Sequence, residues 1–292
     1  MLKLIASDLD GTLLNQQQKI SPLNRYAIAK AQEKGVRFVI ATGRNYARVQ
    51  DLLTENDLHC DLLLMNGSEV RDAQGKIISS INLPMEPLEQ VVELLHAHGM
   101  EPEFMTNRET CSIDPPEQAL RSCALRMQCF HPGVSYEEGL KLAHTDPFYT
   151  ALRFVDGLEG LYQTGLELRK IVSYHPDTQV IDRLTQQFNA MEGIVCMSSF
   201  PVNVEITNAR AQKGWGLEKA IEVMGIRREE VVVFGDGMND YNMFTCFSRC
   251  YAPENAVKPI QDLAKEVIPH HQQDGVGKTI LRLLEEDETP LQ

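Results

Sequence analysis

The sequence predicts an α/β fold with a parallel sheet, interrupted by a separate α+β segment. Strand-like apolar runs alternate with helical patterns through about the first eighty residues and again after about residue 208. This order is typical of a parallel sheet with helices on both faces. The stretch between carries scattered prolines and alternating strand patterns. We therefore expect one core formed by residues 1–83 and 208–292, and an inserted α+β domain at 84–207.

The first elements follow from local signals. Leu2 to Ala6 is an apolar run that predicts a buried strand. A helix is expected after Ser21-Pro22 and should stop at Gly35, because Ser is a favoured N-cap, Pro suits the first helical position and Gly suits the residue past the end. Val36 to Ala41 and Leu62 to Met65 predict the next two buried strands.

The C-terminal part continues the alternation. The expected elements are a helix that closes at Gly225, a strand from Val231 to Phe234, a helix from Asn239, and helices near Ala256 to Ala264 and Val276 to Glu285.

The middle segment differs in texture. It contains Pro115-Pro116 and strands in which apolar and polar residues alternate, as in Val202 to Thr207. Such alternation predicts a sheet with one face packed and the other solvated. These features favour a separate domain over a continuation of the parallel sheet.

Composition restricts the class of protein. The chain has 292 residues, of which 43% are hydrophobic and 24% charged, and its formal net charge is −13. Such an acidic balance argues against nucleic acid and anionic membrane surfaces as partners. No targeting segment and no long apolar stretch is apparent. A cytoplasmic protein without nucleic-acid or membrane partners is the simplest interpretation.

The cysteines predict neither a disulfide framework nor a zinc site. There are seven, scattered and without a Cys-x-x-Cys pair. Cys246 and Cys250 lie one helical turn apart, but buried free thiols explain them better.

Acidic residues follow two of the expected strands. Asp8-Leu9-Asp10-Gly11-Thr12 comes directly after the first strand, and Gly235 to Asp240 comes after Val231 to Phe234. Thr42-Gly43-Arg44 ends another strand. Because ligands of open α/β sheets bind at the carboxyl ends of the strands, these loops can converge. Two acidic loops at this edge predict a magnesium site.

These residue types suit cleavage of a phosphate monoester. Asp8 can attack phosphorus and become an aspartyl phosphate, while Asp10 can protonate the leaving oxygen and later activate water. Carboxylates of Asp8 and Asp236 suit Mg²⁺, which prefers oxygen ligands. Thr42 can donate to a phosphate oxygen, and Lys213 can neutralise the transferring group.

The ordered motifs Asp-x-Asp-Gly-Thr, Ala-Thr-Gly-Arg, Lys and Gly-Asp-Gly-x-Asn-Asp resemble the haloacid dehalogenase (HAD) superfamily. The last motif and the large insertion resemble its Cof-type subfamily IIB, which has a Rossmann-like core and a C2B cap. The resemblance implies an Mg²⁺-dependent phosphatase with Asp8 as nucleophile and Asp10 as general acid/base. It further implies the following roles: metal ligation by Asp8, the Asp10 carbonyl and Asp236, phosphate binding by Thr42, Gly43, Lys213 and Asn239, and support of the metal by Asp240, indirectly or as a ligand.

Two segments depart from the family pattern. Asn208 to Gln212 precedes Lys213 where relatives have a Gly- or Ser-containing turn, and Tyr251 to Ala256 replaces the usual Ala-Met-Gly-Asn-Ala. These differences affect loop detail and substrate fit.

Structural roles compete with the functional ones. Thr42 could cap the next helix, Lys213 could be a solvated lysine at a helix start, and Asn239 with Asp240 could form a cap. Arg44 could be exposed in a first helical turn or contact substrate. The pair His270-His271 is expected at the surface.

Two nucleotide-binding patterns are incomplete. Gly277-Lys278-Thr279 imitates a P-loop, but Gln272 stands where its first glycine belongs. Gly235-x-Gly237 imitates a dinucleotide loop, but Asp240 occupies the third glycine position.

The expected substrate is a small phosphorylated metabolite such as a sugar phosphate. The cations that the inserted segment offers for its recognition include Arg108, Arg121, Arg126, Arg153, Arg169 and Arg183. Two alternatives stay open: a phosphomutase, which returns the phosphoryl group to the sugar, and a non-catalytic regulator that binds a phosphometabolite.

Overall fold

The computed structural model of the chain describes residues 1–131 and 133–288. It divides into two compact units, unit 1 (Met1–Ser80 with the chain from Ala211 onward) and unit 2 (Ile81–Arg210). The boundaries fall at residues 80 and 210, against 83 and 207 expected from the sequence. Among the described residues, no helix is long and apolar enough to cross a lipid bilayer.

Unit 1 contains an eight-stranded sheet in the order β14-β13-β12-β1-β2-β3-β4-β5. The six strands from β14 to β3 pair in parallel, whereas β4 and β5 turn back antiparallel at one edge. The α/β fold expected from the sequence is thus confirmed, with an antiparallel edge added. The strands are β1 (Leu4–Ser7), β2 (Arg37–Ala41), β3 (Asp61–Leu64), β4 (Glu69–Arg71), β5 (Ile77–Ser80), β12 (Val231–Phe234), β13 (Cys250–Pro253) and β14 (Glu266–Ile268).

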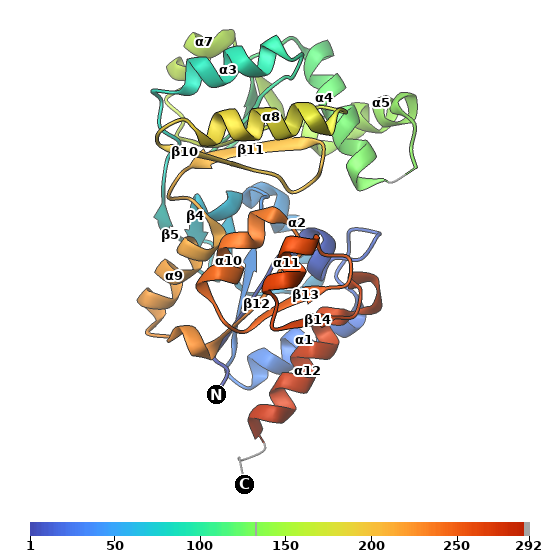
Figure 1. Cartoon of the computed structure of the whole chain (residues 1–292), viewed down its shortest axis with the longest axis vertical. Coiled ribbons are helices and arrows are strands. Elements are labelled where there is room, and N and C mark those ends of the chain that lie inside the picture. The colour runs from blue at the N-terminus through green and yellow to red at the C-terminus, as the bar shows by residue number, and fades with distance from the viewer. Residues whose placement is uncertain (132, 289–292) are drawn as a thin grey trace. The chain divides into compact units, whose positions relative to one another are not determined.

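Helices cover both faces of this sheet (Figure 1). One hydrophobic cluster joins the sheet to α1, α2 and α12, and a second joins it to α9, α10 and α11. Short helical turns, η1 to η5, connect them. The bounds are α1 (Pro22–Glu33), α2 (Tyr46–Asn56), α9 (Lys213–Met224), α10 (Tyr241–Cys246), α11 (Lys258–Leu263), α12 (Gly275–Glu288), η1 (Leu9–Leu13), η2 (Met65–Gly67), η3 (Arg228–Glu230), η4 (Met238–Asp240) and η5 (His271–Gln273).

The expected helix boundaries hold where the capping signals are local. Ser21 is the N-cap of α1 and its side chain accepts a hydrogen bond from the Asn24 amide. Gly225 closes α9 in the left-handed conformation. The helix expected from Asn239 begins instead at Tyr241, because residues 238–240 form a separate tight turn.

Unit 2 is an α+β unit around a six-stranded sheet in the order β10-β11-β9-β6-β7-β8. Its pairs are antiparallel except β7–β8. A hydrophobic cluster packs α3, α7 and α8 against the sheet, as can be followed in Figure 1. The bounds are α3 (Leu88–Ala97), β6 (Glu103–Thr106), β7 (Thr110–Ser112), α4 (Pro116–Phe130), α5 (Tyr136–Thr145), α6 (Pro147–Thr150), β8 (Leu152–Phe154), α7 (Gly157–Gln163), β9 (Leu168–Tyr174), α8 (Thr178–Asn189), β10 (Ile194–Met197) and β11 (Asn203–Asn208).

The polar face of β11 is buried, so the prediction of a solvated face for this strand is wrong. Asn203, Glu205 and Thr207 are each at most 5% exposed. Glu205 forms an ion pair of 2.8 Å with buried Lys170 on β9 and accepts hydrogen bonds from Ser199 and Asn203. Alternation identified the polar face correctly but could not reveal partners that let it be buried.

Candidate active site

The Asp8 loop is fixed at the end of β1. The Asp8 amide donates to the Phe234 carbonyl at 3.0 Å, which ties the ends of β1 and β12 together. The turn η1 then requires a glycine, because Gly11 has φ +77° and a Cβ there would lie 2.3 Å from Oδ2 of Asp236. The loop therefore brings two acidic segments, far apart in sequence, into contact.

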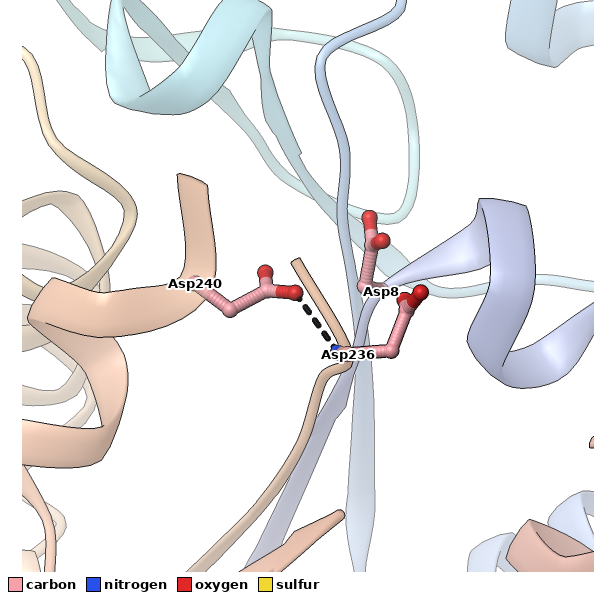
Figure 2. A group of neighbouring side chains, drawn as sticks. All are labelled: Asp8, Asp236 and Asp240. Atoms are coloured by element: carbon pink, nitrogen blue, oxygen red, sulfur yellow. Dashed lines mark hydrogen bonds between the residues drawn. The ribbon is translucent and has the colours of Figure 1, made fainter. Parts of the chain in front are cut away.

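The second acidic loop is held by its own carboxylate. Oδ2 of Asp240 accepts hydrogen bonds from the amides of Asp236 at 2.9 Å and Gly237 at 3.1 Å, the first of which is drawn in Figure 2. Thr12 Oγ1 donates to Asp236 Oδ1 at 2.7 Å. Asp240 thus holds the preceding turn and makes no side-chain cap hydrogen bond to α10, while Thr12 orients Asp236.

Lys213 links the two acidic loops. Its Nζ lies 2.7 Å from Oδ1 of Asp8 and 2.7 Å from Oδ1 of Asp240, and its side chain is fully buried. Lys213 is the first residue of α9, and Gly214 lets this helix end approach α10, because a Cβ there would lie 2.4 Å from the Asn242 carbonyl oxygen. The alternative of a solvated lysine is therefore wrong.

The buried charges perturb one another. Burial raises the pKa of Asp8 to about 7, with Lys213 opposing and Asp240 adding to the rise. Burial and then the charges of Asp8 and Asp240 raise the pKa of Asp236 well above its usual range. Burial lowers the pKa of Lys213, but Asp240 and Asp8 outweigh it and leave that pKa raised. Full ionisation of these carboxylates would therefore leave more negative charge than Lys213 balances. Burial and this excess charge together are why the pKa values of Asp8 and Asp236 rise.

The carboxylates fit a divalent cation. Asp8, Asp236 and Asp240 each offer an oxygen, and these oxygens lie within 4.8 Å of one another (Figure 2). Three carboxylates against one ammonium leave two negative charges when all are ionised. An oxygen-only donor set with this charge suits a hard cation such as Mg²⁺.

Asp10 has a different partner. Arg44 grips its carboxylate with two hydrogen bonds, from Nε to Oδ2 at 3.0 Å and from Nη2 to Oδ1 at 2.5 Å. The same Nη2 donates to Oε1 of Gln18 at 2.6 Å. Arg44 precedes α2, and its side chain is 17% exposed, so the alternative of an exposed residue in a first helical turn is wrong. A substrate contact by Arg44 stays a prediction.

Thr42, Gly43 and Asn239 lie on loops of unit 1, and their binding of phosphate stays a prediction. Thr42 is buried, and its hydroxyl accepts from the Arg44 amide at 3.2 Å. It does not cap α2, whose N-cap is Asn45. Asn239 is 3% exposed in η4.

Sequence reasoning missed the residues that brace the Asp8 loop. Asn255 donates from Nδ2 to the Gly11 carbonyl at 2.7 Å and accepts from the His271 amide at 3.1 Å. His270 and His271 are both half-buried, and His271 Nδ1 lies 2.7 Å from the Leu14 carbonyl oxygen. The Asn-Ala pair that Asn255 forms with Ala256, shared with the usual family pattern, was the available signal.

The two unusual segments keep ordinary structural roles. Tyr251 lies in β13, 1% exposed, with its ring centroid 5.6 Å from that of Phe234. The Gln212 backbone carbonyl accepts a hydrogen bond of 2.9 Å from the Gly216 amide in the first turn of α9. Lys213 keeps its contacts with Asp8 and Asp240 beside both segments.

Two arginines expected to be available in unit 2 are buried. Arg126 is 1% exposed, paired with Glu103 at 2.5 Å and donating to the Tyr174 hydroxyl at 3.0 Å. Arg169 is 2% exposed and pairs with Glu167 at 2.6 Å. Their charges are used in buried pairs. The exposed arginines are Arg108, Arg121, Arg183 and Arg153, the last of which pairs with Glu109 at 2.7 Å.

Comparisons with known proteins give matches over nearly the whole chain. Residues 5–280 match the haloacid dehalogenase-like hydrolase family. The chain is 26% identical over 283 residues to the 5-amino-6-(5-phospho-D-ribitylamino)uracil phosphatase YwtE of Bacillus subtilis, covering 97% of this chain and 98% of that protein. It is 24% identical over 282 residues to the pyridoxal phosphate phosphatase YbhA of Escherichia coli, covering 95% of this chain and 97% of that protein.

A solved structure confirms the fold. A haloacid dehalogenase-like hydrolase from B. subtilis superimposes with a TM-score of 0.86 at 22% identity, covering 97% of this chain and 100% of that one.

Proposed function

Because the chain belongs to the haloacid dehalogenase-like hydrolase family, we propose that it is an Mg²⁺-dependent phosphatase acting on small phosphorylated metabolites through an aspartyl-phosphate intermediate. The observation that carries this proposal is the buried Lys213, which bridges Asp8 and Asp240 beside Asp236. An ammonium in this position holds the nucleophile and can neutralise charge on a transferring phosphoryl group.

The reaction divides into two displacements. Asp8 attacks phosphorus, an Oδ–P bond forms, and the P–O bond to the ester oxygen breaks. Asp10 gives its proton to the leaving oxygen and then takes a proton from the water that attacks the aspartyl phosphate. Free phosphate leaves and Asp8 is restored. Thr42, Gly43 and Asn239 are proposed to hold the phosphate oxygens.

Asp8, Asp236 and the Asp10 carbonyl are the proposed ligands of Mg²⁺. The bound ion would supply charge compensation between anionic nucleophile and anionic substrate. Both oxygens of Asp240 already accept hydrogen bonds, one from Lys213 and one from two backbone amides. This occupancy favours an indirect role for Asp240, as the group that positions Lys213 and the Asp236 loop.

Unit 2 is proposed to select the substrate, in agreement with an inserted cap at 84–207. The residues assigned to phosphoryl transfer all belong to unit 1. The relatives named as phosphatases of a phosphoribitylamino-uracil and of pyridoxal phosphate support a small phosphorylated metabolite as the substrate. A sugar phosphate in particular stays a prediction. A cytoplasmic location stays a prediction.

The deciding experiment is a screen of phosphate esters with the purified full-length protein and Mg²⁺. We expect release of inorganic phosphate without a bisphosphate activator; a requirement for such an activator would instead identify a phosphomutase. Asp8→Asn should abolish release, since it removes the attacking carboxylate at nearly constant volume. Asp51→Asn, at an exposed position of α2, is the matched control.

The cation supplies a second arm of this test. A chelator should stop phosphate release, and Mg²⁺ should restore it. Ca²⁺ should support little turnover, because its larger and more variable oxygen shell disturbs the in-line geometry. Binding of phosphate esters with no turnover under any condition would indicate a regulator.

A further inference from the structure

A glutamine outside every recognised motif contacts the general acid's partner. Gln18 Oε1 accepts a hydrogen bond of 2.6 Å from Nη2 of Arg44, and the same nitrogen donates to Oδ1 of Asp10. Arg44 and Asp10 are only 17% and 20% exposed at their side chains. The three side chains therefore form one partly buried relay in unit 1.

The backbone of Gln18 is built into a tight hairpin. The Asn15 amide donates to the Lys19 carbonyl at 3.0 Å, the Gln18 amide donates to the Asn15 carbonyl at 3.0 Å, and Leu14 bridges Ile20. Gln18 itself has φ +57°, a conformation that is uncommon for a residue with a side chain. The turn thus fixes the backbone position from which the side-chain amide of Gln18 projects.

Its neighbours provide the contrast. Gln16 and Gln17 lie in the same turn and are exposed, whereas Gln18 is half-buried. The hydrogen bond from Gln17 to Asn15 Oδ1 is donated by the backbone amide of Gln17 and does not involve the Gln17 side chain. The three successive glutamines are therefore not equivalent, and Gln18 is the one whose side chain meets Arg44.

A second acceptor on Arg44 has a chemical consequence. The Nε and Nη2 atoms grip both Asp10 oxygens, which fixes the plane of that carboxyl group. Because the arginine side chain is long and flexible, the geometry of its two hydrogen bonds to Asp10 is well defined only if the guanidinium group is itself held in place. Gln18 Oε1 accepts a hydrogen bond from the second N–H of Nη2 and so restricts rotation of the Arg44 guanidinium group.

We propose that Gln18 is a positioning residue for proton transfer, acting through Arg44 on Asp10; this rests on the proposed function. As Asp8 bonds to phosphorus and the P–O bond to the leaving group breaks, Asp10 passes its proton to the leaving oxygen. Negative charge then develops on Asp10, and the Arg44 fork stabilises it. Loosening the fork should weaken this step most when the leaving oxygen depends most on protonation.

The test uses para-substituted phenyl phosphates, which match in size but differ in leaving-group basicity. The parameter kcat/KM reports the steps through formation of the aspartyl phosphate, so its slope against leaving-group pKa measures the need for a proton. In Gln18→Met, which keeps side-chain length but removes the acceptor, we expect about a tenfold loss for p-methylphenyl phosphate and less than about a twofold loss for p-nitrophenyl phosphate.

Two variants serve as controls. Gln18→Glu retains an acceptor oxygen and should restore a slope near that of the wild type. Gln17→Met places the same substitution one residue earlier in the turn and should leave the slope unchanged. An equal loss on all esters, an unaltered slope in Gln18→Met, or the same change in Gln17→Met overturns the proposal.

A measurement without turnover separates this inference from the proposed function. Hydrogen exchange of the Arg44 Nε–H, followed by ¹⁵N NMR and assigned with Arg44→Lys, should accelerate in Gln18→Met and not in Gln17→Met. If the wild type with Mg²⁺ releases no phosphate from any ester, the proposed function fails while this result stands. Unchanged exchange in Gln18→Met refutes the positioning role whether or not the protein is a phosphatase.

Discussion

Replacing Lys213 with methionine is the most direct test of the charge arrangement. The change keeps the length of the buried side chain and removes an ammonium that contacts Asp8 and Asp240 at 2.7 Å each. Removing one partner of a buried ion pair typically costs about 3–5 kcal/mol of unfolding free energy, because the remaining charge is left uncompensated. We expect Lys213→Met to lose about this much near neutral pH.

The loss should depend on pH. The pKa of Asp8 is raised to about 7 in the folded protein, above its unfolded value of 3.8, so the folded state holds more protons between these values. Stability from this group is therefore greatest at low pH and falls as pH rises towards 7. Without Lys213, which lowers the pKa of Asp8, the fall should continue above pH 7 at about 1.4 kcal/mol per pH unit. Lys213 itself, with its pKa raised, stays charged across this range.

The assay is urea unfolding of wild type and Lys213→Met at pH 5.5, 7.0 and 8.5 in the presence of a chelator. Lys219→Met is the control, since Lys219 lies on the same helix in an exposed ion pair with Glu222. Exposed pairs contribute about 0–1 kcal/mol, so this control should change stability little. A loss below about 1 kcal/mol in Lys213→Met, or one that does not grow between pH 7.0 and 8.5, would contradict the reasoning.

Three further outcomes follow from individual contacts. Gly11→Ala should destroy activity, because its Cβ would lie 2.3 Å from Asp236 Oδ2. The control Gly35→Ala has a similar positive φ but open space around it, so it should lower the free energy of unfolding by about 1–2 kcal/mol and leave kcat unchanged. Equal effects of the two variants on activity would argue against the Gly11 contact. Asn255→Ala removes both hydrogen bonds that brace the loop and should cost about 1–3 kcal/mol by thermal unfolding and lower kcat; unaltered kcat would show that the brace is dispensable. Arg153→Ala, at an exposed site of unit 2, should reorder kcat/KM among phosphate esters while kcat for p-nitrophenyl phosphate changes less than about twofold; a uniform loss without unfolding would place chemistry in unit 2.

Local signals explain what the sequence predicted well. The strand Val231 to Phe234 was expected with the bounds that β12 has, because a short run of β-branched and aromatic residues is bounded by clear breaks. The contact between the Asp8 and Asp236 loops was expected from topology alone, since parallel strands end at one edge of the sheet. Periodicity, caps and strand order thus carried the fold and the acidic centre.

Pairings between distant side chains account for what could not be predicted. Lys170 and Glu205 are 35 positions apart and compensate each other only once β9 and β11 are adjacent. The contact of Gln18 with Arg44 depends on one residue adopting a left-handed conformation within a turn. Neither leaves a pattern in residue order, because burial of a charge is decided by its partner rather than by its neighbours in sequence.

Simple electrostatics identifies the carboxylate that most needs a cation. Two unit charges within 4.8 Å repel by at least about 3 kcal/mol at an effective dielectric constant of about 20, and an ammonium at 2.7 Å attracts by about 6 kcal/mol. Lys213 therefore offsets the charges of Asp8 and Asp240, which it contacts directly. The Asp236 carboxylate accepts a hydrogen bond from the Thr12 hydroxyl, which carries no charge, and its pKa is raised well above the usual range. A bound divalent cation should therefore lower the pKa of Asp236 more than that of Asp8. Binding of the cation and ionisation of Asp236 are then coupled, and together they set the charge that an incoming phosphate ester meets.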